Sequence, residues 1–107
     1  MNNPTITEIF AELERATVKF PTWPTDPLHA LGVLHEEVGE LSKEVLQLVY
    51  EPHKTSAAKV REEAIQAAAM ALRFAMSLDT YQYVRGPQHK QGEPSEPRNG
   101  WNNVYAG

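Results

Sequence analysis

Four glutamates occupy the segment HEEVGELSKEV, residues 35 to 45, and the first question is what balances their charge. On a helix, Glu36, Glu40 and Glu44 fall on one line, and Glu37 lies beside that line. Each like-charge pair one turn apart destabilises an isolated helix by roughly 0.2–0.5 kcal/mol. The segment is therefore either a solvated acidic face or one wall of a cation site, and taken alone it leaves both interpretations open.

A second acidic segment, REEAIQAAAMALRF, offers the opposite wall of such a site. If the two segments form an antiparallel pair of helices, Glu37 and Glu40 lie opposite Glu63 and Gln66. Hard cations such as Mg²⁺ prefer several oxygen ligands, and carboxylates on two facing helices hold such ligands rigidly. The alternative is that Glu63 and its neighbour Glu62 only stabilise the start of their helix through its dipole.

Basic and aromatic side chains near these acids are candidates for binding a substrate. Arg73 lies within an apolar helical segment, so its charge needs an anionic partner, either a carboxylate such as Glu62 or a ligand phosphate. Lys59 is a further candidate phosphate partner, and Trp23, which stands between two prolines, is suited to stacking on a nucleobase. The structural alternative is that the lysine is solvated and the tryptophan packs over the end of the core.

Hydrophobic periodicity predicts an all-α chain with three main helices and no strands. The first helix is predicted to begin near Thr5, where Thr5 and Glu8 have the spacing of a capping box. Its apolar residues recur at intervals of three and four as far as Phe20. The segment FPTWPTDP then interrupts the helix, because proline disfavours helical geometry in the residue before it.

Two longer helices follow in the sequence. The second is predicted over about residues 27–50, with Asp26 as its capping residue, and the third over about residues 56–83. The remaining residues are polar and rich in proline and glycine, so we expect a helical domain at 1–85 and a flexible tail at 86–107. The aromatic residues Trp101 and Tyr105 of this tail are candidates for docking on the helical domain.

The third predicted helix is apolar nearly all round. Between Ala64 and Met76 its strongly polar side chains are Gln66 and Arg73, and a helix of this kind has to be covered on several sides. Two other helices of the same small chain hardly suffice for that. We therefore expect a homo-oligomer, a dimer or tetramer, in which antiparallel helical hairpins from different subunits complete a four-helix core. The alternative is a monomer covered by its own tail.

Composition excludes several classes of function. The chain has 107 residues, a formal net charge of −4 and no cysteine. Binding to nucleic acid needs clustered basic residues, so the charge argues against it as the main task. The sequence has no apolar run long enough to cross a membrane, and the N-terminus lacks the pattern of a signal peptide. We expect a cytoplasmic protein that binds neither nucleic acid nor membrane.

The two acidic segments together match a known pattern. EEVGE at residues 36–40 is followed, after twenty-two residues, by EAIQ at residues 63–66. This resembles the EExxE…ExxD signature of the MazG-like all-α nucleoside triphosphate pyrophosphohydrolases. The surrounding text, from FPTWPTDPLHALGVLHEEVGELSKEV to REEAIQAAAMALRF, is similar to small phage-type members of that family. The resemblance covers about residues 18–78.

The resemblance implies an α-helical oligomer that uses Mg²⁺, or alternatively Mn²⁺, to hydrolyse a nucleoside triphosphate to a monophosphate and pyrophosphate. Carried over by position, the metal ligands would be Glu37, Glu40, Glu63 and Gln66. The catalytic residues would be Glu37 and also Glu36, which would bind a further ion or orient the attacking water. Bound metal ions screen the charge of the triphosphate and lower the pKa of bound water.

The sequence departs from the family pattern at one position, where Gln66 replaces the final aspartate. An amide oxygen can ligate a hard cation but brings no charge, so affinity for the metal should fall. One alternative is a non-catalytic helical oligomer that binds nucleotide or acts as a scaffold. Another is a di-iron or di-manganese bundle, which normally needs a Glu-x-x-His sequence that neither acidic segment contains.

Overall fold

The structure is a computed structural model that describes residues 3–84, and within them the chain is entirely helical. Its elements are α1 (Pro4–Lys19), α2 (Pro27–Tyr50), the short 3₁₀ helix η1 (Pro52–Lys54), α3 (Ala57–Met76) and the short 3₁₀ helix η2 (Leu78–Thr80). The prediction of an all-α chain with three main helices is confirmed for these residues. The predicted tail at 86–107, with Trp101 and Tyr105, lies outside the described residues.

The first helix begins at a different cap from the one predicted. Asn3 is the N-cap, and its side-chain oxygen accepts a hydrogen bond of 2.9 Å from the amide of Thr5, while Pro4 takes the first helical position. The capping box predicted for Thr5 and Glu8 was wrong, because both side chains instead accept hydrogen bonds from Arg61 on α3. The helix ends at Lys19, just before the residue that precedes Pro21.

The predicted bounds of α2 agree with the structure, and Asp26 caps the helix by accepting a hydrogen bond of 2.8 Å from the amide of Leu28. Ser56 caps α3 in the same way, at 3.1 Å from the amide of Lys59. The predicted end of α3 near Tyr83 was wrong, because the α-helix ends at Met76. The chain then turns through η2 and runs back across the molecule.

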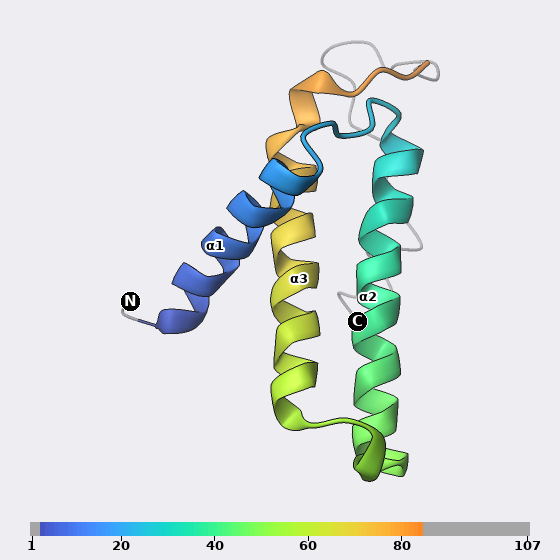
Figure 1. The fold of residues 1–107 in the computed structure, drawn as a ribbon. Coiled ribbons are helices and arrows are strands. Elements are labelled where there is room, and N and C mark those ends of the chain that lie inside the picture. Colours follow the sequence, from blue (N-terminus) through green and yellow to red (C-terminus); the bar gives the residue numbers. More distant parts are fainter. Residues whose placement is uncertain (1–2, 85–107) are drawn as a thin grey trace, which may run out of the picture.

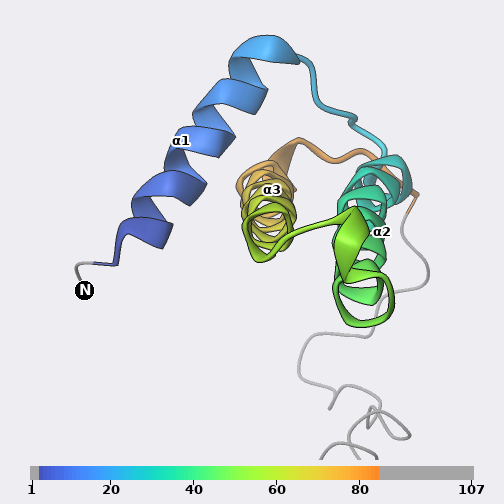
Figure 2. The ribbon, with the colours of Figure 1, turned by 60° about the horizontal axis from the view of Figure 1, so that its bottom comes forward.

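The elements are arranged around α3, which both other helices pack against. Helices α2 and α3 lie side by side and run in opposite directions, joined by η1 at one end (Figure 1). Helix α1 lies obliquely on the other side of α3, and its N-terminus points away from α2 (Figure 2). The segment after α3 returns to the connection between α1 and α2, where the amide of Gln82 donates to the carbonyl of Thr25 at 2.8 Å.

The buried core of the described chain is small. It consists mainly of alanines, with Met70 as its one larger apolar member, and no large side chain in residues 3–84 is completely buried. Ala16 of α1 and Ala69 of α3 meet at its centre, where their small side chains let the two helices approach closely. None of the helices in the described part combines the length and apolar content that crossing a bilayer requires.

Candidate functional site

A pocket of about 390 Å³ lies where the three helices and the α1–α2 connection meet. The volume falls in the range of pockets that hold small ligands. The pocket has two chemically different ends, because its carboxylates and its aromatic rings come from different levels of the helices. The acidic end is formed by Glu12, Glu36, Glu37 and Gln66, and the aromatic end by Phe20, Trp23, Pro24 and Arg73.

Glu37 is the central carboxylate of the acidic end. Its pKa is raised above the ordinary value of 4.5, first because the side chain is partly removed from water, and then by the negative charges of Glu63, Glu40, Glu12 and Glu36. These neighbours come from α1, α2 and α3, so acids distant in the sequence act on one carboxyl group. The arrangement disfavours the ionised form of Glu37 and would favour any cation that enters.

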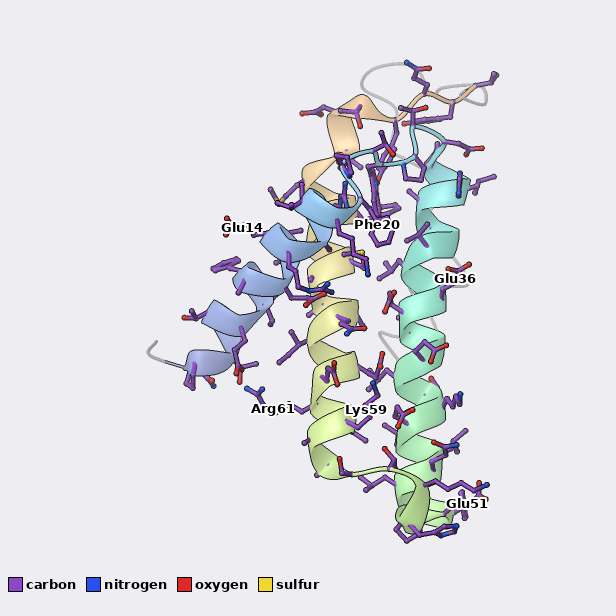
Figure 3. The ribbon with its side chains drawn as sticks, viewed as in Figure 1. Glu14, Phe20, Glu36, Glu51, Lys59 and Arg61 are labelled. Atoms are coloured by element: carbon purple, nitrogen blue, oxygen red, sulfur yellow. The ribbon has the colours of Figure 1, made fainter. Side chains whose placement is uncertain are left out.

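Glu63 on α3 is buried, with 6% of its surface exposed, and its charge acts on Glu37 although, like Glu40, it does not line the pocket. Its nearest cation is the ammonium of Lys59, at 3.3 Å, and the same ammonium lies 3.5 Å from Glu62. The hydrogen bond to Glu63, followed by the charge of Glu62, raises the pKa of Lys59 and keeps it protonated. Lys59 thus lies among the carboxylates, on the side of α3 that faces α2 (Figure 3), and does not line the pocket.

Glu44, the last member of the acidic line on α2, has a different role. It is buried and accepts a short hydrogen bond of 2.5 Å from the hydroxyl of Thr55, in the connection to α3. This contact fastens the start of α3 to the end of α2. A solvated acidic face therefore does not describe Glu44, and we assign it to the connection between the helices.

Two residues of α1 that were not predicted from the sequence also line the pocket: Glu12 and Arg15. Glu12 acts on Glu37 and is held by the guanidinium of Arg15 at 2.5 Å. The carboxylate of Glu12 in turn raises the pKa of Arg15 through this hydrogen bond and its charge. A signal was present in the sequence, because Glu12 lies three residues after Ile9 and four before Ala16, on the buried side of α1.

Arg73 is buried, with 8% of its surface exposed, and lines the aromatic end of the pocket. Its guanidinium donates a hydrogen bond of 2.7 Å to the carbonyl of Phe20 and lies 4.9 Å from the centre of the Trp23 ring. The suggested carboxylate partner Glu62 was wrong, because Glu62 pairs with Lys59. Among residues 3–84, no carboxylate forms an ion pair with Arg73.

Trp23 is held in position by the segment that follows α3. Its indole N–H donates to the hydroxyl of Tyr81 at 2.9 Å, and that hydroxyl donates to the carbonyl of Phe74 at 3.0 Å. The rings of Tyr81 and Phe74 lie 5.1 Å apart. The indole also packs against the core, as the structural alternative suggested. The ring is therefore oriented in advance, and it still borders the pocket.

The acidic end can be tested for its fit to a metal ion. Carboxylate oxygens together with the amide oxygen of Gln66 form a donor set that suits Mg²⁺ or Mn²⁺. As the side chains stand, no three acidic or histidine residues within 3–84 are close enough together to hold one ion. Mutual repulsion separates carboxylates that lack a cation between them, so rotation of these side chains toward an ion would be required.

The chain was compared with protein-family models, with curated proteins and with solved structures, and none of the three comparisons finds a match. The resemblance to the pyrophosphohydrolases therefore rests on the two acidic segments and the sequence around them. The site has to be interpreted from its own geometry and charge.

Proposed function

We propose that this chain is a Mg²⁺-dependent nucleoside triphosphate pyrophosphohydrolase that works as a homo-oligomer. The observation that carries the proposal is the position of Glu37, a carboxyl group on which three helices focus negative charge at one end of a pocket. Repulsion between Glu37 and its neighbouring carboxylates destabilises the fold unless a bound cation compensates their charge. The arrangement therefore favours binding of a cation.

The other end of the pocket supports a nucleotide as the substrate. Aromatic and cationic groups, represented by Trp23 and Arg73, border the same pocket as the acids. A nucleoside triphosphate has an aromatic base at one end and a polyanion that carries Mg²⁺ at the other. The two ends of the pocket match these two parts of the molecule, with the phosphates toward the acids.

Each residue has a defined task in this proposal. Glu37, Glu40 and Glu63 would hold Mg²⁺ with carboxylate oxygens, and Gln66 would add an amide oxygen without charge. Glu36 would orient the attacking water from the same wall of the pocket. The bound metal would neutralise the phosphates and lower the pKa of that water.

Lys59 has two functions in the proposal, one without and one with metal. In the free protein its ammonium balances the buried Glu63. When a metal ion takes over that charge, the ammonium becomes free to pair with a phosphate oxygen. Exchange of one cation for another on Glu63 avoids leaving a buried carboxylate without a partner.

Exposed apolar surfaces support the oligomer. On α2, Leu31, Val38 and Val45 recur every seven residues and are each about 40% exposed. A second, wholly apolar groove of about 470 Å³ lies between α1 and α3, with Ile6 and Phe10 on one side. We propose that hairpins of α2 and α3 from two subunits pack into a four-helix core, because these surfaces would otherwise remain in water.

The test is release of pyrophosphate from a panel of ribonucleoside and deoxyribonucleoside triphosphates, with Mg²⁺, with Mn²⁺ and with chelator. We expect metal-dependent pyrophosphate release from at least one of them, and a loss of at least about 100-fold in Glu37→Gln and Glu63→Gln. Glu14→Gln is the matched control, because Glu14 lies on the outer side of α1, away from α3 (Figure 3). It should retain full activity.

The scaffold alternative predicts a different result. If the acids only solubilise the helices, divalent cations leave the melting temperature unchanged and no triphosphate is cleaved. If cations stabilise the protein and nucleotide binds without cleavage, the chain is a nucleotide-binding relative in which Gln66 has removed catalysis. Restoring the family residue with Gln66→Asp should then produce activity.

A further inference from the structure

The guanidinium of Arg73 is largely buried and has more N–H donors than the hydrogen bond to Phe20 uses. It carries five N–H donors, of which one is used by the carbonyl of Phe20. The guanidinium carbon lies over the Trp23 ring, 4.9 Å from its centre, and this contact is not a conventional hydrogen bond. No carboxylate in the described chain compensates its charge. No fully buried side-chain nitrogen of residues 3–84 lacks a hydrogen-bond partner, so the other N–H groups of this largely buried cation reach solvent, where acceptors of a ligand in the pocket can replace water.

The position of Arg73 along α3 decides which part of the ligand it meets. Arg73 follows Gln66 by seven residues, which corresponds to about 10 Å along the helix at roughly 1.5 Å per residue. Gln66 lies at the acidic end with Glu37, and Arg73 lies beside Trp23 at the aromatic end. With metal-bound phosphates at the acids, the base of the nucleotide reaches Arg73.

We propose that the Arg73–Trp23 end of the pocket binds a 6-oxopurine base, guanine or hypoxanthine, whose O6 and N7 accept hydrogen bonds from the Arg73 guanidinium. This proposal rests on the nucleotide function proposed above and specifies the base. Two adjacent N–H groups of a guanidinium match the adjacent O6 and N7 acceptors of guanine, and this pairing is the commonest specific contact between arginine and a base.

The same geometry disfavours adenine. Adenine presents an amino group where guanine has O6, so its donor would meet the donors of Arg73. A donor that faces another donor leaves both without a hydrogen-bond partner where the base fills the pocket.

The Arg73 guanidinium and two aromatic rings, Trp23 and Phe20, would hold the base in place. The fixed position of Trp23, through Tyr81, keeps the guanidinium oriented before any ligand arrives. The Phe20 ring, which is largely exposed and lines the pocket, supplies a second aromatic surface (Figure 3). Preorganised contacts of this kind give selectivity because the protein does not have to reorganise on binding.

The experiment measures binding of GMP, IMP and AMP to the full chain without divalent cations, by isothermal titration calorimetry. All three carry the same phosphate, so contacts to the phosphate cancel in the comparison. We expect GMP and IMP to bind with similar affinity and each at least about fivefold more tightly than AMP. Arg73→Lys, which keeps the charge but loses the paired donors, should bring the three affinities to within about twofold.

Arg61→Lys is the matched control for the variant. Arg61 is on the same helix but pairs with Glu8 on the side of α1, and it does not line this pocket (Figure 3). It should keep the preference for GMP and IMP. Circular dichroism shows whether each variant is folded, and the ratio of GMP to AMP affinity in the unmodified chain tests the proposal without any variant.

Several results would overturn the proposal. Equal affinities for GMP and AMP in the unmodified chain would do so directly. So would metal-free binding of inorganic pyrophosphate that depends on Arg73, because the guanidinium would then belong to the phosphates. The two proposals fail separately: absence of triphosphate cleavage with an intact GMP preference refutes the enzyme alone, and cleavage without base preference refutes the base site alone.

Discussion

Replacing Glu37 by glutamine removes one negative charge from the acidic end of the pocket and nearly preserves the shape of the side chain. The structure predicts that this substitution stabilises the protein when no divalent cation is present. Glu37 is repelled by Glu63, Glu40 and Glu12, and it is partly buried. All of these effects oppose the ionised carboxylate and leave a neutral amide almost unaffected.

The size of the effect follows from the neighbours of Glu37. Repulsion from Glu40 on the same helix is worth roughly 0.2–0.5 kcal/mol. Glu63 and Glu12 act through partly solvated space, so each contributes a similar amount rather than a buried-pair energy. The total is on the order of 1 kcal/mol, which corresponds to about 4–8 °C in Tm for a chain of this size.

Mg²⁺ should reverse the order of the two Tm values, so that the unmodified chain becomes more stable than Glu37→Gln. A concentration 100 times the Kd stabilises the unmodified chain by about 2.7 kcal/mol. If loss of the Glu37 ligand weakens binding by about 100-fold, the same concentration stabilises Glu37→Gln by only about 0.4 kcal/mol. Thermal unfolding followed by circular dichroism, with chelator and with Mg²⁺, measures both values. Crossing of the two Tm values is the expected result.

The pH dependence of stability is a second test of whether Glu37→Gln stabilises the fold. The folded state raises the pKa of Glu37, so the fold prefers the protonated carboxyl group. The penalty is absent below the ordinary value of 4.5 and develops as the pH rises from there through the raised pKa. The stabilising effect of Glu37→Gln should therefore grow as the pH rises above 4.5, be complete above the raised pKa, and vanish as the pH falls below about 4.5.

Glu14→Gln serves as the control for a general loss of charge and should change Tm little under any of these conditions. The reasoning is refuted if Glu37→Gln lowers Tm in chelator near neutral pH. It is also refuted if Mg²⁺ shifts both proteins by the same amount, because Glu37 would then not be a ligand.

Further predictions concern the cation on Glu63, the helix caps and the exposed stripe. Lys59→Gln should lower Tm in chelator, because the buried Glu63 loses its ion pair at 3.3 Å. Mg²⁺ should restore most of the lost Tm. Equal losses with and without Mg²⁺ would contradict the exchange of Lys59 for a metal ion on Glu63. Asp26→Ala removes the cap of α2 and should cost about 1 kcal/mol in urea unfolding, whereas Thr25→Ala, which leaves the cap intact, should cost much less. Val38→Glu, which places a charge on the exposed stripe of α2, should shift light-scattering mass toward the monomer, and an unchanged mass would exclude this stripe as an interface.

Most of the secondary structure follows from local signals that a single sequence displays. Asp26 and Ser56 are capping residues directly before apolar periodic segments, and both cap helices in the structure. The end of α3 was missed because no proline or glycine follows Met76 before Gly86. The chain turns after Met76 because Tyr81 packs on Phe74 and its hydroxyl accepts a hydrogen bond from Trp23. Contacts between distant residues decide such an end, and local propensity does not register them.

The candidate site, too, has residues that local sequence signals identify and residues that depend on contacts between distant parts of the chain. Spacing on the helices grouped Glu37, Glu40, Glu63 and Gln66, because helical periodicity fixes which residues share a face; of these, Glu37 and Gln66 line the pocket. The participation of Glu12, and the absence of a described carboxylate that pairs with Arg73, depend on where α1 crosses α3. That crossing is set by close packing of Ala16 on Ala69, which involves residues far apart in the chain. The sequence by itself thus determined the helices and the acidic faces they carry, whereas only the tertiary structure decided which charges meet and which buried cation has no ion pair within residues 3–84.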